Sequence, residues 1–278
     1  MADDVTPPAG PERPLVPDRQ ERARRTSYRL RFGIIYIVLA AILGAGIGSF
    51  IVLWSQGDPP EDPAWSAWAP HGSRQAKVRQ IADRIPKAYR NDDGSQLTVS
   101  LTSSLSVPTE NGDLPVRAIV VRPDVSKGLA EEDDIATYNG SDVVSYGLCG
   151  ADSKQQCELA KGVSSAERFT LLRRQALELS LYTLKYVDDV DSVIVFMPPS
   201  QKGESNGSIF LRRSDVREEL ERPISSLLPT KRPKVGNLTS LEEGQIVRLT
   251  EPRTYAAQVQ ALPDGNPVLV LTPPNQPS

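Results

Sequence analysis

The sequence has 278 residues, with 32 lysines and arginines against 35 aspartates and glutamates, which gives a formal net charge of −3. A length of this order predicts one or two domains, and the charge balance excludes a strongly basic nucleic-acid-binding protein. One histidine and two cysteines leave little material for a Cys/His zinc site or a haem site. We therefore expect no cofactor and no nucleic-acid partner.

The charges are distributed unevenly along the chain. Residues 1–31 carry seven arginines and five acidic residues, residues 32–54 carry no charge, and residues 55–278 carry 25 basic and 30 acidic residues. The first segment also holds five prolines and few large apolar side chains, so it cannot bury enough surface to fold alone. We expect residues 1–31 to form a disordered arm.

Residues 32–54 are expected to form a transmembrane helix. The segment is 23 residues long and 18 of them are apolar, which at about 1.5 Å per residue is enough to cross a hydrocarbon core of about 30 Å. A cleaved signal peptide is the alternative, but its apolar region would be about 7–15 residues long. The length of this segment favours an uncleaved signal anchor in the lipid bilayer.

The charges on either side of this segment predict its orientation. Cytoplasmic flanks of membrane spans are enriched in arginine and lysine. A group of arginines precedes the span: Arg22, Arg24, Arg25, Arg29 and Arg31. Acidic residues follow it, and the first basic residue beyond it is Arg74. We therefore expect a single-pass protein of the plasma membrane and cell envelope, with a cytoplasmic N-terminus and an extracytoplasmic C-terminal domain.

Small residues recur every four positions within the predicted span. Ala40, Gly44 and Gly48 fall on one helix face, and the two glycines form a G-x-x-x-G motif, which lets two helix backbones approach closely. Glycine and alanine are also simply common in membrane helices. The motif is therefore a weak indication of self-association or of pairing with a partner helix.

Residues 55–72 are rich in proline and tryptophan and are expected to form a stalk. The acidic segment 56–63 holds three prolines and is expected to be extended. Trp65 and Trp68 follow it, and they could lie at the membrane surface or against the folded domain. Large aromatic side chains dominate the energetics of protein cores, so we favour packing on the domain.

Residues 73–272 show the patterns of an α+β domain with a mixed, mainly antiparallel sheet and two or three helices, followed by a disordered tail at 273–278. Apolar residues at helical spacing predict a helix between Ser73 and Arg90 with basic residues on its other face, and a longer one from Ser164 to about Val187. A short helix is expected to end near Leu220. Residues 124–141 are expected to form a polar loop.

Runs of alternating or continuous apolar residues predict the strands. These runs are 97–101, 118–123, 143–149, 192–198, 209–213 and 245–249. The segments TYAAQVQA and PVLVLTP flank the turn sequence Pro-Asp-Gly-Asn at 263–266 and predict a terminal hairpin.

Cys149 and Cys157 lie eight residues apart in a polar segment. In an extracytoplasmic domain, two neighbouring cysteines favour a structural disulfide. A redox-active pair is the alternative, but the spacing is not C-x-x-C and no basic pattern marks a lowered thiol pKa.

Three further patterns could carry chemistry, and each has a simpler interpretation. Asp188, Asp189 and Asp191 form an acidic turn that is a weak metal candidate, although it lacks EF-hand spacing. The G-x-S-x-G at 203–207 lacks a later histidine and lies in a polar loop. The basic residues at 231–234 could contact an anionic partner but are also typical of a charged surface loop.

No catalytic residues are therefore predicted. We expect a non-enzymatic, single-pass envelope protein whose outer domain binds a protein partner, or which forms a homo-oligomer or membrane complex through its membrane helix and outer domain. The alternative is a membrane-anchored envelope hydrolase that uses carboxylates on glycan or peptide substrates, for example Asp188 or Asp191 with Glu131. A third hypothesis is a sensor that transmits binding at the outer domain to the arm.

Overall fold

The computed structural model describes residues 33–42, 64–103, 105–109, 112–124, 134–151, 157, 164–198 and 207–274. The chain divides into two compact units, Met1–Asp62 and Pro63–Ser278. Each unit is described here by itself.

In the first unit, residues 33–42 form a helix of exposed, mostly apolar side chains. Among the residues that can be described, no helix is both long enough and apolar enough to cross a membrane. Most of the predicted span at 32–54 lies outside the described residues, as do the arm at 1–31 and the arginines within it. Ala40 lies in the helix, whereas Gly44 and Gly48 are also outside the described residues.

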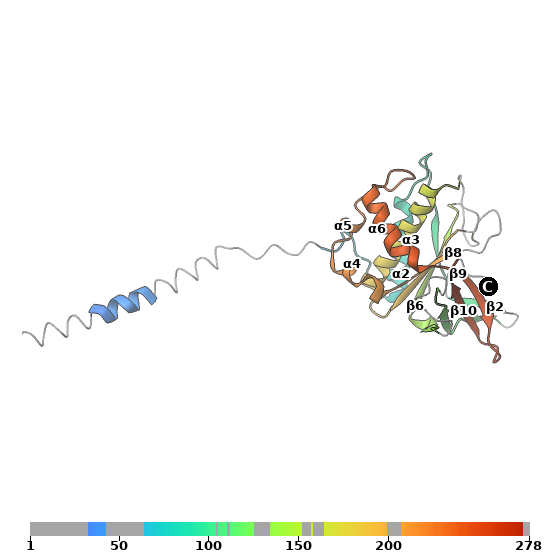
Figure 1. The fold of residues 1–278 in the computed structure, drawn as a ribbon, viewed down its shortest axis with the longest axis horizontal. Helices are drawn as coiled ribbons and strands as arrows, with labels where there is room; N and C mark the ends of the chain where they lie inside the picture. The colour runs from blue at the N-terminus through green and yellow to red at the C-terminus, as the bar shows by residue number, and fades with distance from the viewer. Residues whose placement is uncertain are drawn as a thin grey trace, which may run out of the picture. The chain divides into compact units, whose positions relative to one another are not determined.

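The second unit is an α+β domain with several helices (Figure 1). They are α2 (Arg74–Arg84), α3 (Ala166–Tyr186), α4 (Arg217–Glu221), α5 (Ile224–Leu227) and α6 (Ser240–Thr250). Short 3-10 helices also occur. The first, η1 (Ile85–Ala88), follows α2, and η3 (Gly140–Asp142) ends directly before residue 143. Two more, η4 (Arg213–Val216) and η5 (Glu251–Arg253), precede α4 and follow α6.

Eight strands form one mixed sheet in the order β1-β6-β7-β8-β9-β10-β4-β5. Their bounds are β1 (Val99–Ser103), β4 (Ala118–Val121), β5 (Ala136–Asn139), β6 (Val143–Cys149), β7 (Ser192–Phe196), β8 (Gly207–Arg212), β9 (Thr254–Ala261) and β10 (Pro267–Thr272). The pairs β6–β7 and β10–β4 are parallel and the other five are antiparallel. A separate hairpin joins β2 (Ser106–Thr109) to β3 (Gly112–Pro115).

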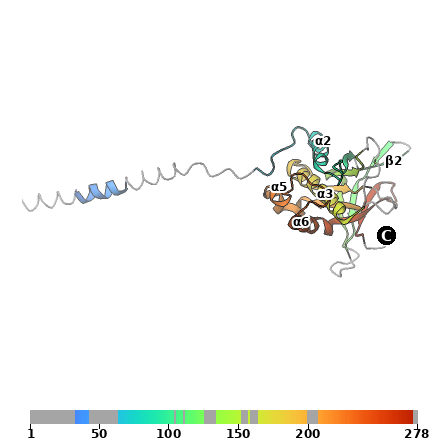
Figure 2. The same cartoon turned by 90° about the horizontal axis from the view of Figure 1, so that it is seen from above.

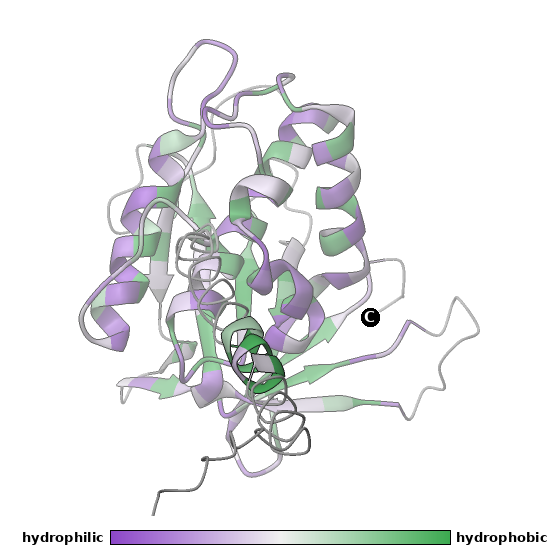
Figure 3. Cartoon of the chain, turned by 90° about the vertical axis from the view of Figure 1, so that its left-hand side faces the viewer, coloured by the Kyte–Doolittle hydropathy of each residue, from purple (hydrophilic) through white to green (hydrophobic). Residues whose placement is uncertain are grey.

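The central strands are buried on both faces, with the helices gathered on one of them (Figures 1 and 2). In β7, Val193 and Val195 join the helix-side core, while Ile194 between them joins a second cluster on the opposite face. Because successive strand residues point to opposite faces, burial on both sides produces an almost continuous apolar run. In Figure 3 these strands are hydrophobic, whereas the helices carry many hydrophilic residues.

The end of the sheet that holds β4 and β5 curves back over the second cluster. Arg212 in β8 donates a hydrogen bond to the Tyr138 hydroxyl of β5 at 2.8 Å, and the Tyr138 and Phe210 ring centroids lie 5.3 Å apart. Four strand spacings separate β8 from β5, which in a flat sheet would be about 19 Å. The contact therefore requires strong curvature, which shields the apolar side chains of this face from water.

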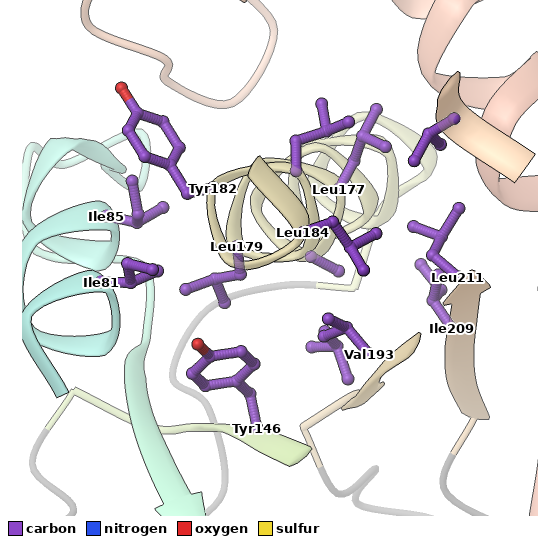
Figure 4. Close-up of a cluster of buried hydrophobic side chains, with 14 of the residues drawn as sticks. Ile81, Ile85, Tyr146, Leu177, Leu179, Tyr182, Leu184, Val193, Ile209 and Leu211 are labelled. Atoms are coloured by element: carbon purple, nitrogen blue, oxygen red, sulfur yellow. The ribbon is translucent and has the colours of Figure 1, made fainter. Parts of the chain in front are cut away.

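Helix α3 lies at the centre of the helix-side core. Figure 4 shows Ile81 of α2 and Ile85 of η1 pointing towards α3, while Tyr146 of β6 lies close to Leu179 of α3. The Tyr146 hydroxyl forms a hydrogen bond with Thr183 of the same helix at 2.7 Å. Helix α3 is thus fixed by apolar packing and by a buried polar contact to the sheet.

A buried ionic cluster joins α3 to α6. Arg174 donates from Nε to Glu242 at 2.7 Å and from Nη1 to Glu178 at 3.1 Å, and its side chain is 2% exposed. The Tyr89 hydroxyl lies between Arg174 and Glu178, and the Thr230 hydroxyl donates to the second Glu242 oxygen at 2.5 Å. Burial raises the pKa of Glu178, against the opposing effect of the Arg174 charge.

The folded unit includes the tryptophan-containing segment. Trp65 lies edge-on to Tyr182 and Tyr186, with ring centroids 5.1 and 5.6 Å away, and its indole nitrogen donates to the Glu219 carbonyl at 3.1 Å. Trp68 is partly buried against the same core. The prediction that these tryptophans pack on the domain is confirmed.

Several other predictions are confirmed. The helix near Ser73–Arg90, the long helix, the strand pair β7–β8 and the terminal hairpin β9–β10 all form. Cys149 and Cys157 are joined by a disulfide, with their Cα atoms 5.0 Å apart. This disulfide is typical of a domain in an oxidising, extracytoplasmic compartment.

The predicted strand at 245–249 is wrong, because these residues belong to helix α6. The Thr239 side chain caps this helix by accepting from the Glu242 amide, and Ile246 and Leu249 turn towards the core. Short apolar runs do not distinguish a strand from a buried helix segment. Burial of the Ile246–Leu249 face is what favours the helix.

Two further predictions need correction. The long helix α3 begins at Ala166 and not at Ser164, because Ser165 is its cap: the Ser165 hydroxyl accepts from the Arg168 amide at 3.1 Å. The predicted loop at 124–141 contains strand β5, which is stabilised by antiparallel pairing with β4. Residues 125–133 of that loop lie outside the described residues.

We expect Glu242→Gln to lower the free energy of unfolding by about 1.5–3 kcal/mol, because it removes the charge of one of the two carboxylates that pair with Arg174. Urea unfolding of the full chain in detergent, followed by tryptophan fluorescence, measures this loss. Glu243→Gln is the matched control, because Glu243 is next in sequence and only half-buried. Equal midpoints for the two variants would contradict the importance of the ion pair.

Candidate functional site

A groove of about 760 Å³ lies between α2 and the start of β6. We call it the α2 groove. It is defined by four residues of α2 (Arg74, Gln75, Val78 and Arg79), the segment 115–117, the turn 139–141 and residues 143–145 of β6, with Thr102 and Leu105 beside them. It is an open hollow lined by both polar and apolar side chains. Such mixed concave surfaces are typical of binding sites.

The α2 side of the groove follows from the local sequence of that helix. The Ser73 hydroxyl accepts from the Ala76 amide and caps the helix at its first turn. Ile81 and Ala82 are buried against the core, which turns Arg74, Val78 and Arg79 towards the groove. The basic face of this helix, visible in the sequence, therefore forms one wall.

The opposite wall depends on a close backbone contact at Gly140. The Gly140 amide donates to the Arg117 carbonyl at 2.8 Å. A Cβ atom at residue 140 would lie 2.1 Å from the Val116 carbonyl oxygen, which no real side chain tolerates. The absence of a side chain therefore lets the 139–141 turn lie against the 116–117 segment, and this contact places Arg117 at the rim.

The three arginines of the groove differ in whether they already form ion pairs within the domain. Arg74 donates to Asp189 at 3.1 Å and to the Ser141 carbonyl at 2.9 Å, so it is held across the end of the groove. Within the described ranges, no ion pair involves Arg79 or Arg117. Both side chains are exposed and can bind an anionic group.

None of the described residues that line the α2 groove is acidic. Asp264 in the β9–β10 turn has a lowered pKa, chiefly because the Asn266 amide and side chain donate to it, with a smaller contribution from Arg117. Of the other acids close by, Asp189 is paired with Arg74, and Asp142 accepts a hydrogen bond from the Ser141 hydroxyl. The groove therefore presents a local excess of positive charge.

A second hollow of about 620 Å³ lies where α3 ends and contains Asp191. Its cations are largely satisfied within the domain. Lys185 donates to the Leu220 carbonyl at 2.7 Å, Arg212 pairs with Asp215 at 2.6 Å, and Arg213 donates to carbonyls at the end of α3. This hollow therefore offers less free binding capacity than the α2 groove.

The acidic turn after α3 makes contacts with the groove wall. Asp188 and Asp189 are exposed, and they pair with Lys77 at 4.0 Å and Arg74 at 3.1 Å. Asp191 is exposed as well. No cluster of three or more His, Cys, Asp or Glu side chains suited to a metal ion occurs in the described part of the chain.

The other sequence motifs lie away from the groove or outside the described residues. Residues 203–206 of the G-x-S-x-G motif and Glu131 are not among the described residues. The basic residues at 231–234 are exposed in the connection before α6 and do not line the α2 groove. Nothing in the sequence indicated that Arg117 would join the arginines of α2.

Comparison of the chain with protein-family models, curated proteins and solved structures gives no significant match.

We expect Gly140→Ala to lower the free energy of unfolding by about 1–3 kcal/mol, because the new methyl group forces the two backbone segments apart. Gly244→Ala is the control, since no atom lies within 4 Å of its added Cβ, and an alanine inside a helix stabilises by about 0.5–1 kcal/mol. Urea midpoints of the full-length proteins measure both changes. A Gly140→Ala variant as stable as the parent would contradict the close contact.

Proposed function

We propose that this chain is a single-pass, membrane-anchored envelope protein whose extracytoplasmic domain binds a protein partner without catalysing a reaction. The observation that carries the proposal is the open α2 groove, which combines unpaired arginines with apolar side chains. Arginine is enriched at protein interfaces, and mixed apolar and polar surfaces are typical of non-obligate ones.

The proposed location rests on three features of the chain. The uncharged segment 32–54 has the length of a membrane span, and the arginines before it favour a cytoplasmic N-terminus. The Cys149–Cys157 disulfide supports an oxidising compartment for the folded domain. These features together support an uncleaved anchor with the domain outside.

The core position of Trp65 limits how far the domain can lie from the proposed membrane span. Ten residues separate Trp54, at the end of the predicted span, from Trp65. Even a fully extended chain of this length reaches only roughly 40 Å. The proposed partner therefore meets the domain close to the membrane surface.

A thiol assay in cells that express the full chain tests the proposed location. Cells are quenched with acid and the protein is treated with a maleimide polymer. Without a reductant we expect no polymer to attach, because both cysteines are paired in the disulfide. After reduction we expect two polymer chains to attach to each protein chain. The protein should also stay with the membranes at alkaline pH. The Cys157→Ser variant is the control and should accept one label without reduction; two labels on the unreduced parent would contradict an extracytoplasmic domain.

Photo-crosslinking tests the proposed binding site. A photoreactive residue at Gln75, which lines the groove and is exposed, should give a discrete adduct in intact cells. The same residue at Gln258, which is exposed on β9 and does not line the groove, is the control. An adduct of about twice 30.4 kDa would identify a second copy as the partner. Absence of an adduct at Gln75, or equal adducts at both positions, would contradict the proposal.

A further inference from the structure

We infer that the α2 groove binds an extended, acidic and partly apolar peptide segment. This inference rests on the proposed function and specifies the chemistry of the partner. The charge, the apolar lining and the strand edge at the groove each contribute to the argument.

The charge of the groove is opposite to that of the chain around it. Residues 55–278 carry 25 basic and 30 acidic residues, yet the described part of the groove lining holds three arginines and no acid. A peptide rich in carboxylates is therefore attracted to the groove although the net charge of residues 55–278 is negative. Electrostatic complementarity of this kind contributes mainly to specificity and to the rate of association.

The two arginines available to a ligand stand on opposite walls. Arg79 belongs to α2, whereas Arg117 lies just before β4 and is placed by the contact at Gly140. Both are exposed and, within the described residues, neither takes part in an ion pair. A ligand lying between the walls can present carboxylates to both, and each arginine can receive them in bidentate geometry.

The apolar part of the lining favours a peptide over an anionic polymer. Val78 and Leu105 are half-buried, while Val116 and Val143 are buried with only small exposed areas. An extended peptide presents alternate side chains to opposite sides, so aliphatic residues can face this surface while acidic residues face the arginines. A polyphosphate chain has no apolar groups to place there.

The edge of β6 supports an extended conformation of the ligand. The register of β1 with β6 ends at the pair Ser103–Ser145, whereas β6 begins at Val143. Residues 143–144 therefore lie beyond the last β1 pair in the described chain, and both line the groove. An added strand at such an edge gains main-chain hydrogen bonds, while side-chain contacts provide the specificity.

Fluorescence anisotropy with the full chain in detergent micelles tests this inference. The probe is a fluorescein-labelled decapeptide in which glutamate and valine alternate. We expect Arg79→Glu and Arg117→Glu each to weaken binding about tenfold, because each replaces an attraction by a repulsion. Arg232→Glu, which makes the same charge change outside the groove, should change binding less than about twofold.

Two further ligands separate the possible outcomes. A glutamine–valine decapeptide should bind about tenfold more weakly than the acidic probe, because it lacks the carboxylates. Polyphosphate should displace the probe only weakly; tighter binding of polyphosphate would overturn the peptide in favour of an anionic polymer. Equal weakening by Arg232→Glu would overturn the groove as the site.

Failure of the inference can be told apart from failure of the proposed function. If Gln75 crosslinks to a partner in cells and the acidic probe does not bind, the partner-binding function stands and the acidic peptide is wrong. If both experiments fail, the groove is not a binding site. Near-ultraviolet circular dichroism of the exposed-arginine variants checks that each remains folded.

Discussion

Burial of helix α3 on nearly all sides is the constraint on which the rest of the domain depends. Thirteen of its 21 residues are buried, so sheet, α2 and α6 must all cover it. Arg174 sits within this layer, and a buried charge is tolerated only when it is paired and hydrogen-bonded. Glu242, Glu178 and the Thr230 carbonyl meet this requirement from separate segments. The ion pair with Glu242 therefore holds α6 in its place on α3.

The groove depends on the curvature of the sheet at the end that holds β4 and β5. Curvature brings β5 towards β8, as the Arg212–Tyr138 contact shows, and the chain then turns back through 140–142 into β6. Gly140 allows this turn to touch the backbone before β4 without a steric clash. The turn and α2 consequently stand on either side of the β6 start. The groove is the hollow between these two walls and the start of β6.

Local patterns were most informative where a segment has one strong periodicity or two buried faces. The long helix has an apolar pattern that only a helix can bury, and β7 is a continuous apolar run. Residues 245–249 were ambiguous, because their helical state depends on contacts of Ile246 and Leu249 with the core. Strand β5 has few apolar residues, and its pairing with β4 is a long-range contact that periodicity does not reveal.

The sequence by itself determined the division into a basic arm, an uncharged segment and an acidic domain, because these depend only on the order of residues along the chain. It also indicated the disulfide partners, since only two cysteines are present. The tertiary structure alone determined which arginine side chains without an ion-pair partner among the described residues lie close together. Arg79 and Arg117 are 38 positions apart in sequence and face one groove only after the turn at Gly140 is packed against residues 116–117.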